Sequence, residues 1–143
     1  MRLTSVFVRK KRVYVDAKVL GIHDPNLQRF AYVCYVVEGS PLRSARPSKA
    51  TETDDAEIDA IIFAIGDLKT KLKRFIVVCD HQSVVSEAMK FDEISKNFLL
   101  NELRKTLADN WSVIELTALK SNPAHGYLTE FVNKQRLMKD ASS

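Results

Sequence analysis

The sequence is poor in the residues that mark specialised structural classes. Only two of its 143 residues are cysteine, four are glycine and four are proline. Cys34 and Cys79 each lie in an apolar stretch without a Cys-x-x-Cys pair or adjacent histidines. We therefore expect two buried free thiols, and neither a disulfide framework nor a zinc site.

Long apolar runs are also missing. No stretch approaches the roughly 18 consecutive apolar residues that indicate a membrane-spanning helix, and residues 1–8 lack the apolar core of a signal peptide. These features predict a cytoplasmic protein with no membrane partner.

What is present is typical of one globular domain. A length of 143 residues fits a single core, so we expect one domain over residues 1–143. The net charge of +4 favours polyanionic partners such as nucleic acid. The basic residues gather in two clusters, each of which is either a binding surface or a solvated turn or helix end: Arg9, Lys10, Lys11 and Arg12, and then Lys69, Lys71, Lys73 and Arg74.

The first part of the chain has the pattern of β-strands. Residues 13–22 and 29–37 are rich in valine and tyrosine and flank a turn signal at 23–26, which predicts a hairpin. Residues 3–8 are expected to add an edge strand or extend the first one. Residues 39–50 contain two prolines and predict a turn followed by an edge strand.

From residue 54 the pattern becomes helical. Apolar residues at helical spacing predict an amphipathic helix over 54–72, and the apolar run 75–79 predicts a strand covered on both faces. Helices at 82–89 and 94–109, a strand at 111–119 and a helix at 127–138 follow. This order predicts an α/β fold with a mixed five-stranded sheet, three antiparallel strands then two parallel, and helices on both faces.

Three acidic residues are placed to meet on this scaffold. Asp16 lies within the first strand, Glu57 near the start of the first long helix, and Asp80 directly after the buried strand. If the strands of Asp16 and Asp80 are neighbours, the three carboxylates converge and need a cation to balance their charge. With no histidine or thiolate expected beside them, the oxygen ligands suit Mg²⁺ or Mn²⁺. Two such ions would support hydrolysis of a phosphodiester.

Each acid also has a structural alternative. Asp54 and Glu57 have the spacing of a helix capping box. Asp80 has the position of an N-cap for the next helix, and Asp16 would need no partner if its side chain faced outward from the strand. All three roles together are less expected than a shared site.

The sequence resembles the type I ribonuclease H domain over nearly its whole length. Residues 13–16 (VYVD) are similar to the end of that family's first strand, residues 53–60 (TDDAEIDA) to the opening of its first helix, and residues 76–85 (IVVCDHQSVV) to its fourth strand and the helix that follows. The resemblance implies that Asp16, Glu57 and Asp80 are catalytic metal ligands. It also implies endonucleolytic cleavage of the RNA strand of RNA/DNA hybrids with Mg²⁺ or Mn²⁺.

The resemblance further implies where nucleic acid binds. The glycine that usually follows the first acid is replaced by Ala17, the family's hybrid-contacting asparagine by Asp54, and the serine after the third acid by His81. The basic protrusion of bacterial members is absent, so the first cluster is expected to replace it. The nucleic-acid-binding residues implied are Arg9, Lys10, Lys11, Arg12, Lys18, Asp54 and His81.

The last helix differs from the family at one important position. The resemblance places Thr129 where the family carries a fourth carboxylate, and Glu130 would substitute for it if the register shifted by one residue. His125, in the loop with Asn122, matches a family histidine that helps to release product or move protons. Glu130 and His125 are therefore further candidate catalytic residues.

Three functions remain open at this point. The first is a metal-dependent endonuclease of ribonuclease H type. The second is a catalytically impaired module that binds nucleic acid or a nucleoprotein assembly, which Thr129 favours. The third is a dimeric junction resolvase of the same superfold, which residues 82–85 disfavour. The sequence leaves the oligomeric state open.

Overall fold

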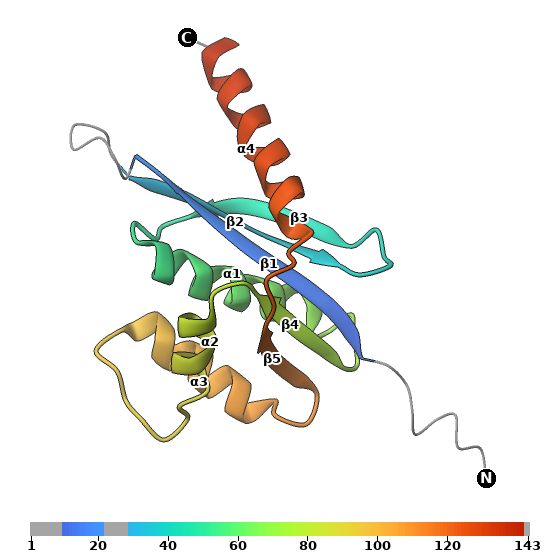
Figure 1. The fold of residues 1–143 in the computed structure, drawn as a ribbon, viewed down its shortest axis with the longest axis vertical. Coiled ribbons are helices and arrows are strands. Elements are labelled where there is room, and N and C mark those ends of the chain that lie inside the picture. The colour runs from blue at the N-terminus through green and yellow to red at the C-terminus, as the bar shows by residue number, and fades with distance from the viewer. Residues whose placement is uncertain (1–9, 22–28, 142–143) are drawn as a thin grey trace.

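The computed structural model describes residues 10–21 and 29–141. Arg9, the expected strand at 3–8 and the turn at 23–26 lie outside these residues. Nine elements follow one another in the predicted order (Figure 1): β1 (Lys11–Leu20), β2 (Phe30–Val37), β3 (Arg43–Ser48), α1 (Thr53–Leu68), β4 (Phe75–Cys79), α2 (Gln82–Ala88), α3 (Phe98–Asp109), β5 (Ile114–Ala118) and α4 (Ala124–Ala141).

The strands form one mixed sheet in the order β3-β2-β1-β4-β5. β1 pairs antiparallel with β2, and β2 antiparallel with β3. β4 pairs parallel with β1 on one side and with β5 on the other. The apolar run of β4 is therefore an inner strand, and the predicted mixed sheet is confirmed.

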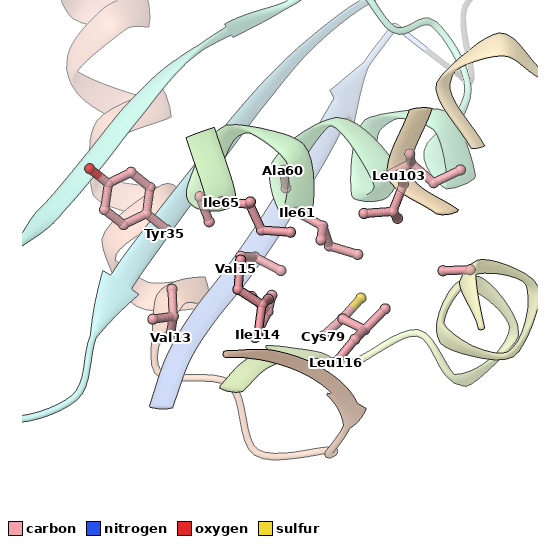
Figure 2. Packing of buried hydrophobic residues seen from close by; sticks show 14 of the residues in the cluster. Val13, Val15, Tyr35, Ala60, Ile61, Ile65, Cys79, Leu103, Ile114 and Leu116 are labelled. Carbon is pink, nitrogen blue, oxygen red and sulfur yellow. The ribbon is translucent and has the colours of Figure 1, made fainter. Parts of the chain in front are cut away.

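Helices cover both faces of this sheet. Figure 2 shows α1 packed over β1, with Ile61 and Ile65 against Val13 and Val15, and this cluster extends to α2 and α3. Alternate residues of a strand point to opposite faces, so Tyr14 lies in a second cluster, with Leu128 of α4. The prediction of helices on both faces is confirmed.

Local hydrogen bonds moved two helix starts away from the predicted positions. The helix expected from residue 94 begins at Phe98, because the side chain of Asn97 accepts the Leu100 N–H as an N-cap. The helix expected from residue 127 begins at Ala124, whose N–H is accepted by the Asn122 side chain. None of the helices in the described residues combines the length and apolar character needed to cross a membrane.

Two other boundaries fall inside the predicted ranges. The helix expected to reach residue 72 ends at Leu68, where the Lys71 N–H bonds to the Leu68 carbonyl in a tighter turn. The strand expected from residue 111 begins at Ile114, because the N–H groups of Val113 and Ile114 bond back to the carbonyl of Asn110. Turns therefore occupy the outer residues of both predicted elements.

Both cysteines are buried free thiols, as the sequence predicts. The Cys34 thiol lies 3.6 Å from the Ala124 carbonyl oxygen, and the Cys79 thiol lies 3.7 Å from Glu57 Oε2. Burial raises the pKa of both thiols. They therefore stay protonated and unreactive near neutral pH.

Candidate metal centre

The centre lies where β4 separates from β1. The two strands pair in parallel from Lys11 and Phe75 to Tyr14 and Val78. β4 then ends at Cys79, whereas β1 continues beside β2 to Leu20. Asp16 and Asp80 each stand two residues beyond the last of these pairs. Because β1 and β4 run parallel and both acids lie two residues beyond the last pair, the two acids lie at the same end of the sheet, at the carboxyl end of β4.

Glu57 reaches the same end of the sheet from α1. Its side chain is 1% exposed, because α1 packs this face over the sheet. The backbone N–H of Ala17 lies beside both the Glu57 and the Asp16 carboxylates, where it partly offsets the burial that raises the pKa of each. Carboxylate oxygens of Glu57 and Asp80 lie within 4.8 Å of each other, whereas Asp16, the third predicted ligand, is outside this group of ligand atoms and only close enough to feel the charge of Asp80.

The charge of Asp80 acts on both Asp16 and Glu57. Burial, and then the charges of Asp16 and Asp80, raise the pKa of Glu57 to about 9. Burial is also the main cause that raises the pKa of Asp16, to which the charge of Asp80 adds. In residues 10–21 and 29–141, no lysine or arginine forms an ion pair with any of the three. A proton or a bound cation must therefore balance the charge.

His81 joins two of these acids, which corrects the expectation that no histidine accompanies them. Possible ligand atoms of Glu57, Asp80 and His81 all lie within 4.8 Å of one another. The Nε2 atom of His81 is 3.3 Å from Glu57 Oε1 and 3.6 Å from Asp80 Oδ1. The expectation was wrong because the position of His81 directly after Asp80 does not reveal that its ring reaches Glu57 of α1.

Asp16 has a different histidine neighbour. The Nδ1 atom of His125 lies 3.1 Å from Asp16 Oδ2, and the His125 side chain is 74% exposed. Asn122 positions this part of α4 by donating to the Val15 carbonyl over 2.8 Å and accepting the Ala124 N–H. Asn122 had no predicted role, although an asparagine before Pro123 is a common signal for a helix start.

Thr129 and Glu130 face different ways on α4. Thr129 lies one turn after His125, and its hydroxyl donates to the His125 carbonyl over 2.9 Å. Glu130 is exposed, and five residues of helix rotate its side chain by about 140° from that of His125. Thr129 therefore shares the His125 face, and Glu130 does not.

The structural alternatives for the acids are not found. The N-cap of α1 is Glu52, without a side-chain cap bond, so Asp54 and Glu57 form no capping box. The N-cap of α2 is His81, not Asp80. Asp16 is 4% exposed and does not face outward. Helix capping therefore accounts for none of the three acids, and Asp16 and Glu57 are buried, whereas Asp80 is exposed.

The described residues of the first basic cluster, Lys10, Lys11 and Arg12, lie away from these acids. Lys11 and Arg12 pair with the first residues of β4, at the opposite end of the parallel strands. Arg12 and Lys10 are four and six residues before Asp16, which is about 13 and 20 Å of strand. Lys10 also forms an ion pair with Glu115 of β5.

The other residues expected to contact nucleic acid are spread around the centre. Lys18 is half-buried two residues after Asp16, on the same face of β1. Asp54 is exposed in the first turn of α1, about one turn before Glu57. The second basic cluster, Lys69 to Arg74, leads directly into Phe75, the partner of Lys11. The two basic clusters therefore meet at one edge of the sheet.

Comparisons with known proteins agree with this architecture. No protein-family model and no curated protein matches the sequence. Among solved structures, the chain is similar to ribonuclease H1 from the halophilic archaeon Halobacterium salinarum, at 16% identity and a TM-score of 0.57, over 78% of this chain and 86% of that one. It is also similar to LC11 ribonuclease H1 in complex with an RNA/DNA hybrid, at 18% identity and a TM-score of 0.56, over 77% and 85%.

A viral structure is similar in the same way. The chain matches the native protease-reverse transcriptase of prototype foamy virus at 18% identity and a TM-score of 0.62, over 78% of this chain. It spans only 17% of that longer chain. At identities this low, the agreement in structure establishes the fold only. The chain has a ribonuclease H-like α/β fold.

Proposed function

We propose that this domain is a metal-dependent endonuclease that hydrolyses the RNA strand of RNA/DNA hybrids. The observation that carries the proposal is the set of acids at the end of β4, where Asp16 and Glu57 are buried without a lysine or arginine partner in the described residues. Burying carboxylates is costly unless a cation or proton compensates them. The fold shared with a hybrid-bound ribonuclease H1 supports the choice of substrate.

The residues present fit a divalent cation. Glu57 and Asp80 offer carboxylate oxygens and His81 a ring nitrogen within 4.8 Å of one another. Asp16 is not in this group, but its carboxylate feels the charge of Asp80. Mg²⁺ and Mn²⁺ are bound largely by such oxygens. When bound, the metal would activate water and stabilise charge on the phosphodiester oxygens.

The protein groups then have distinct tasks. Glu57 and Asp80 would hold the metal, and the Ala17 N–H with the His125 ring would orient Asp16 toward it. The exposed His125 ring, 3.1 Å from Asp16, would carry a proton between Asp16 and solvent. Lys18, on the Asp16 face of β1, is placed to contact a phosphate.

A cleavage assay tests the proposal. The domain is incubated with a labelled RNA/DNA hybrid in Mg²⁺ or Mn²⁺. The variants Asp16→Asn and Asp80→Asn are tested in parallel, and Asp109→Asn, which alters an exposed acid on α3, is the control. We expect the parent and Asp109→Asn to cleave the hybrid. In the two site variants the cleavage rate should fall at least about 100-fold, the typical effect of removing one general acid–base or electrostatic group. Equal activity in Asp80→Asn would refute the proposed site.

The second candidate, a binding module without hydrolysis, is favoured by one observation. The residue on the His125 face of α4 is Thr129, whose hydroxyl is bonded to the helix backbone, rather than a carboxylate. Thr129→Asp places an acid there. If the missing acid limits the rate, this variant gains at least about tenfold in kcat/KM, equal to about 1.4 kcal/mol of transition-state stabilisation. Hybrid binding without cleavage by either protein would favour the module.

A further inference from the structure

The ring of His81 lies within reach of two acids of the centre. Its Nε2 atom faces both acids, 3.3 Å from Glu57 Oε1 and 3.6 Å from Asp80 Oδ1. The other Glu57 oxygen lies near the Cys79 thiol, at 3.7 Å. The Oε1 atom of Glu57 is therefore the one directed to His81 and Asp80.

These separations suit three donors around one ion. Two ligand atoms about 2.1–2.2 Å from a metal lie about 3.0 Å apart at an octahedral angle and about 3.5 Å apart at a tetrahedral one. The two distances from Nε2 fall close to this range. The His81 side chain is 35% exposed, so an ion can reach it from solvent.

We propose that His81 Nε2 coordinates the metal with Glu57 and Asp80, and that this nitrogen makes the centre select Mn²⁺ over Mg²⁺. The inference rests on the metal centre of the proposed function and concerns which ion it holds. Mg²⁺ strongly prefers oxygen ligands and gives up its waters reluctantly. First-row transition ions accept an imidazole more readily, with affinity rising from Mn²⁺ toward Cu²⁺.

A different role for His81 makes the opposite prediction. A protonated ring would act as a cation that balances Glu57 and Asp80, and it would have to be displaced or deprotonated before a metal binds. Removing such a ring would strengthen Mn²⁺ binding. Removing a ligand weakens it. The sign of the change therefore separates the two roles.

The test is Mn²⁺ and Mg²⁺ binding by titration calorimetry, with pulsed EPR of the Mn²⁺-loaded domain. His81→Ser introduces the residue that the ribonuclease H resemblance predicts at this position. His125→Gln is the comparison variant, because it removes the other described histidine beside an acid of the centre and so tests whether that ring supplies the nitrogen instead. Thermal unfolding of the metal-free variants verifies that each one folds.

We expect an imidazole nitrogen coupling to Mn²⁺ in the parent and in His125→Gln, and its loss in His81→Ser. Mn²⁺ affinity should fall at least about tenfold in His81→Ser, the scale typical of disturbing a single metal-site partner, and Mg²⁺ affinity by a smaller factor. Absence of nitrogen coupling in the parent, or tighter Mn²⁺ binding by His81→Ser, would overturn the inference.

The outcomes also separate this inference from the proposed function. Nitrogen coupling to bound Mn²⁺ without hybrid cleavage supports His81 as a ligand and contradicts the nuclease. Metal-dependent cleavage without nitrogen coupling supports the nuclease and overturns the role of His81. Binding of neither ion overturns both.

Discussion

Replacing Glu57 by glutamine should stabilise the metal-free domain above neutral pH. Glutamine has nearly the shape of a protonated glutamate and no charge to bury. In the folded state, burial and the charges of Asp16 and Asp80 raise the pKa of Glu57 to about 9, from an ordinary value of 4.5. Between these two pH values the folded protein holds a proton that the unfolded chain has released, so the free energy of unfolding falls as pH rises.

The size of the effect follows from linkage. Each pH unit between the two pKa values costs about 1.4 kcal/mol. At pH 7 the parent therefore loses about 3 kcal/mol that Glu57→Gln keeps, which corresponds to about 10 °C in Tm for a chain of this length. At pH 4.5 and below, where glutamate is protonated in both states, the difference should vanish.

The measurement is thermal and urea unfolding in a chelator from pH 4.5 to 9. Glu102→Gln, which alters an exposed glutamate of α3, is the control and should follow the parent. Mn²⁺ at 100 times Kd and pH 8 should recover about 2.7 kcal/mol of the loss in the parent, and do little for Glu57→Gln. A metal-free parent that is most stable at pH 8 would refute the reasoning.

Two further predictions concern regions outside the centre. Arg104→Met should lower the free energy of unfolding by about 3 kcal/mol in urea, because the 4% exposed Arg104 donates to the carbonyls of Glu87 and Glu93, which would lose their partners. Changing Lys11 and Arg12 to glutamine should weaken hybrid binding. The slope of log K against log salt should also become shallower, by about 0.9 for each phosphate that the variant no longer neutralises.

Each of these has a clear contrary result. An unchanged urea midpoint in Arg104→Met would mean that water satisfies both carbonyls. An unchanged salt slope would mean that the basic edge binds no phosphate, and Lys134→Gln, on the exposed part of α4, controls for loss of net charge alone.

The order of elements was predictable because the patterns are strong and local. The apolar run at β4 and the helical spacing of isoleucines in α1 each predict one element from a few neighbouring residues. The nearness of Asp16 and Asp80 followed from the sheet, since parallel neighbours bring equivalent positions together. Helix starts were less predictable, because they depend on whether the side chains of Asn97 and Asn122 make cap bonds.

The histidine at the centre could not be predicted in the same way. His81 follows Asp80 in the sequence, but its contact with Glu57 depends on how the chain turns between β4 and α2 and on how α1 packs over the sheet. A resemblance that places a serine at this position gives no indication of a nitrogen ligand. Side-chain direction after a strand end is set by tertiary packing.

Asn122 links the start of α4 to the centre by hydrogen bonds. Its amide binds the carbonyl of Val15, next to Asp16, and caps the first residue of the helix. Figure 1 shows the far end of α4 projecting beyond the sheet, where Leu137 and Met138 are more than half exposed. The first half of α4 packs on the sheet through Leu128 and Val132. A molecule that binds the exposed end of the helix would therefore influence Asp16 only through this packed half and the Asn122 hydrogen bond to the Val15 carbonyl.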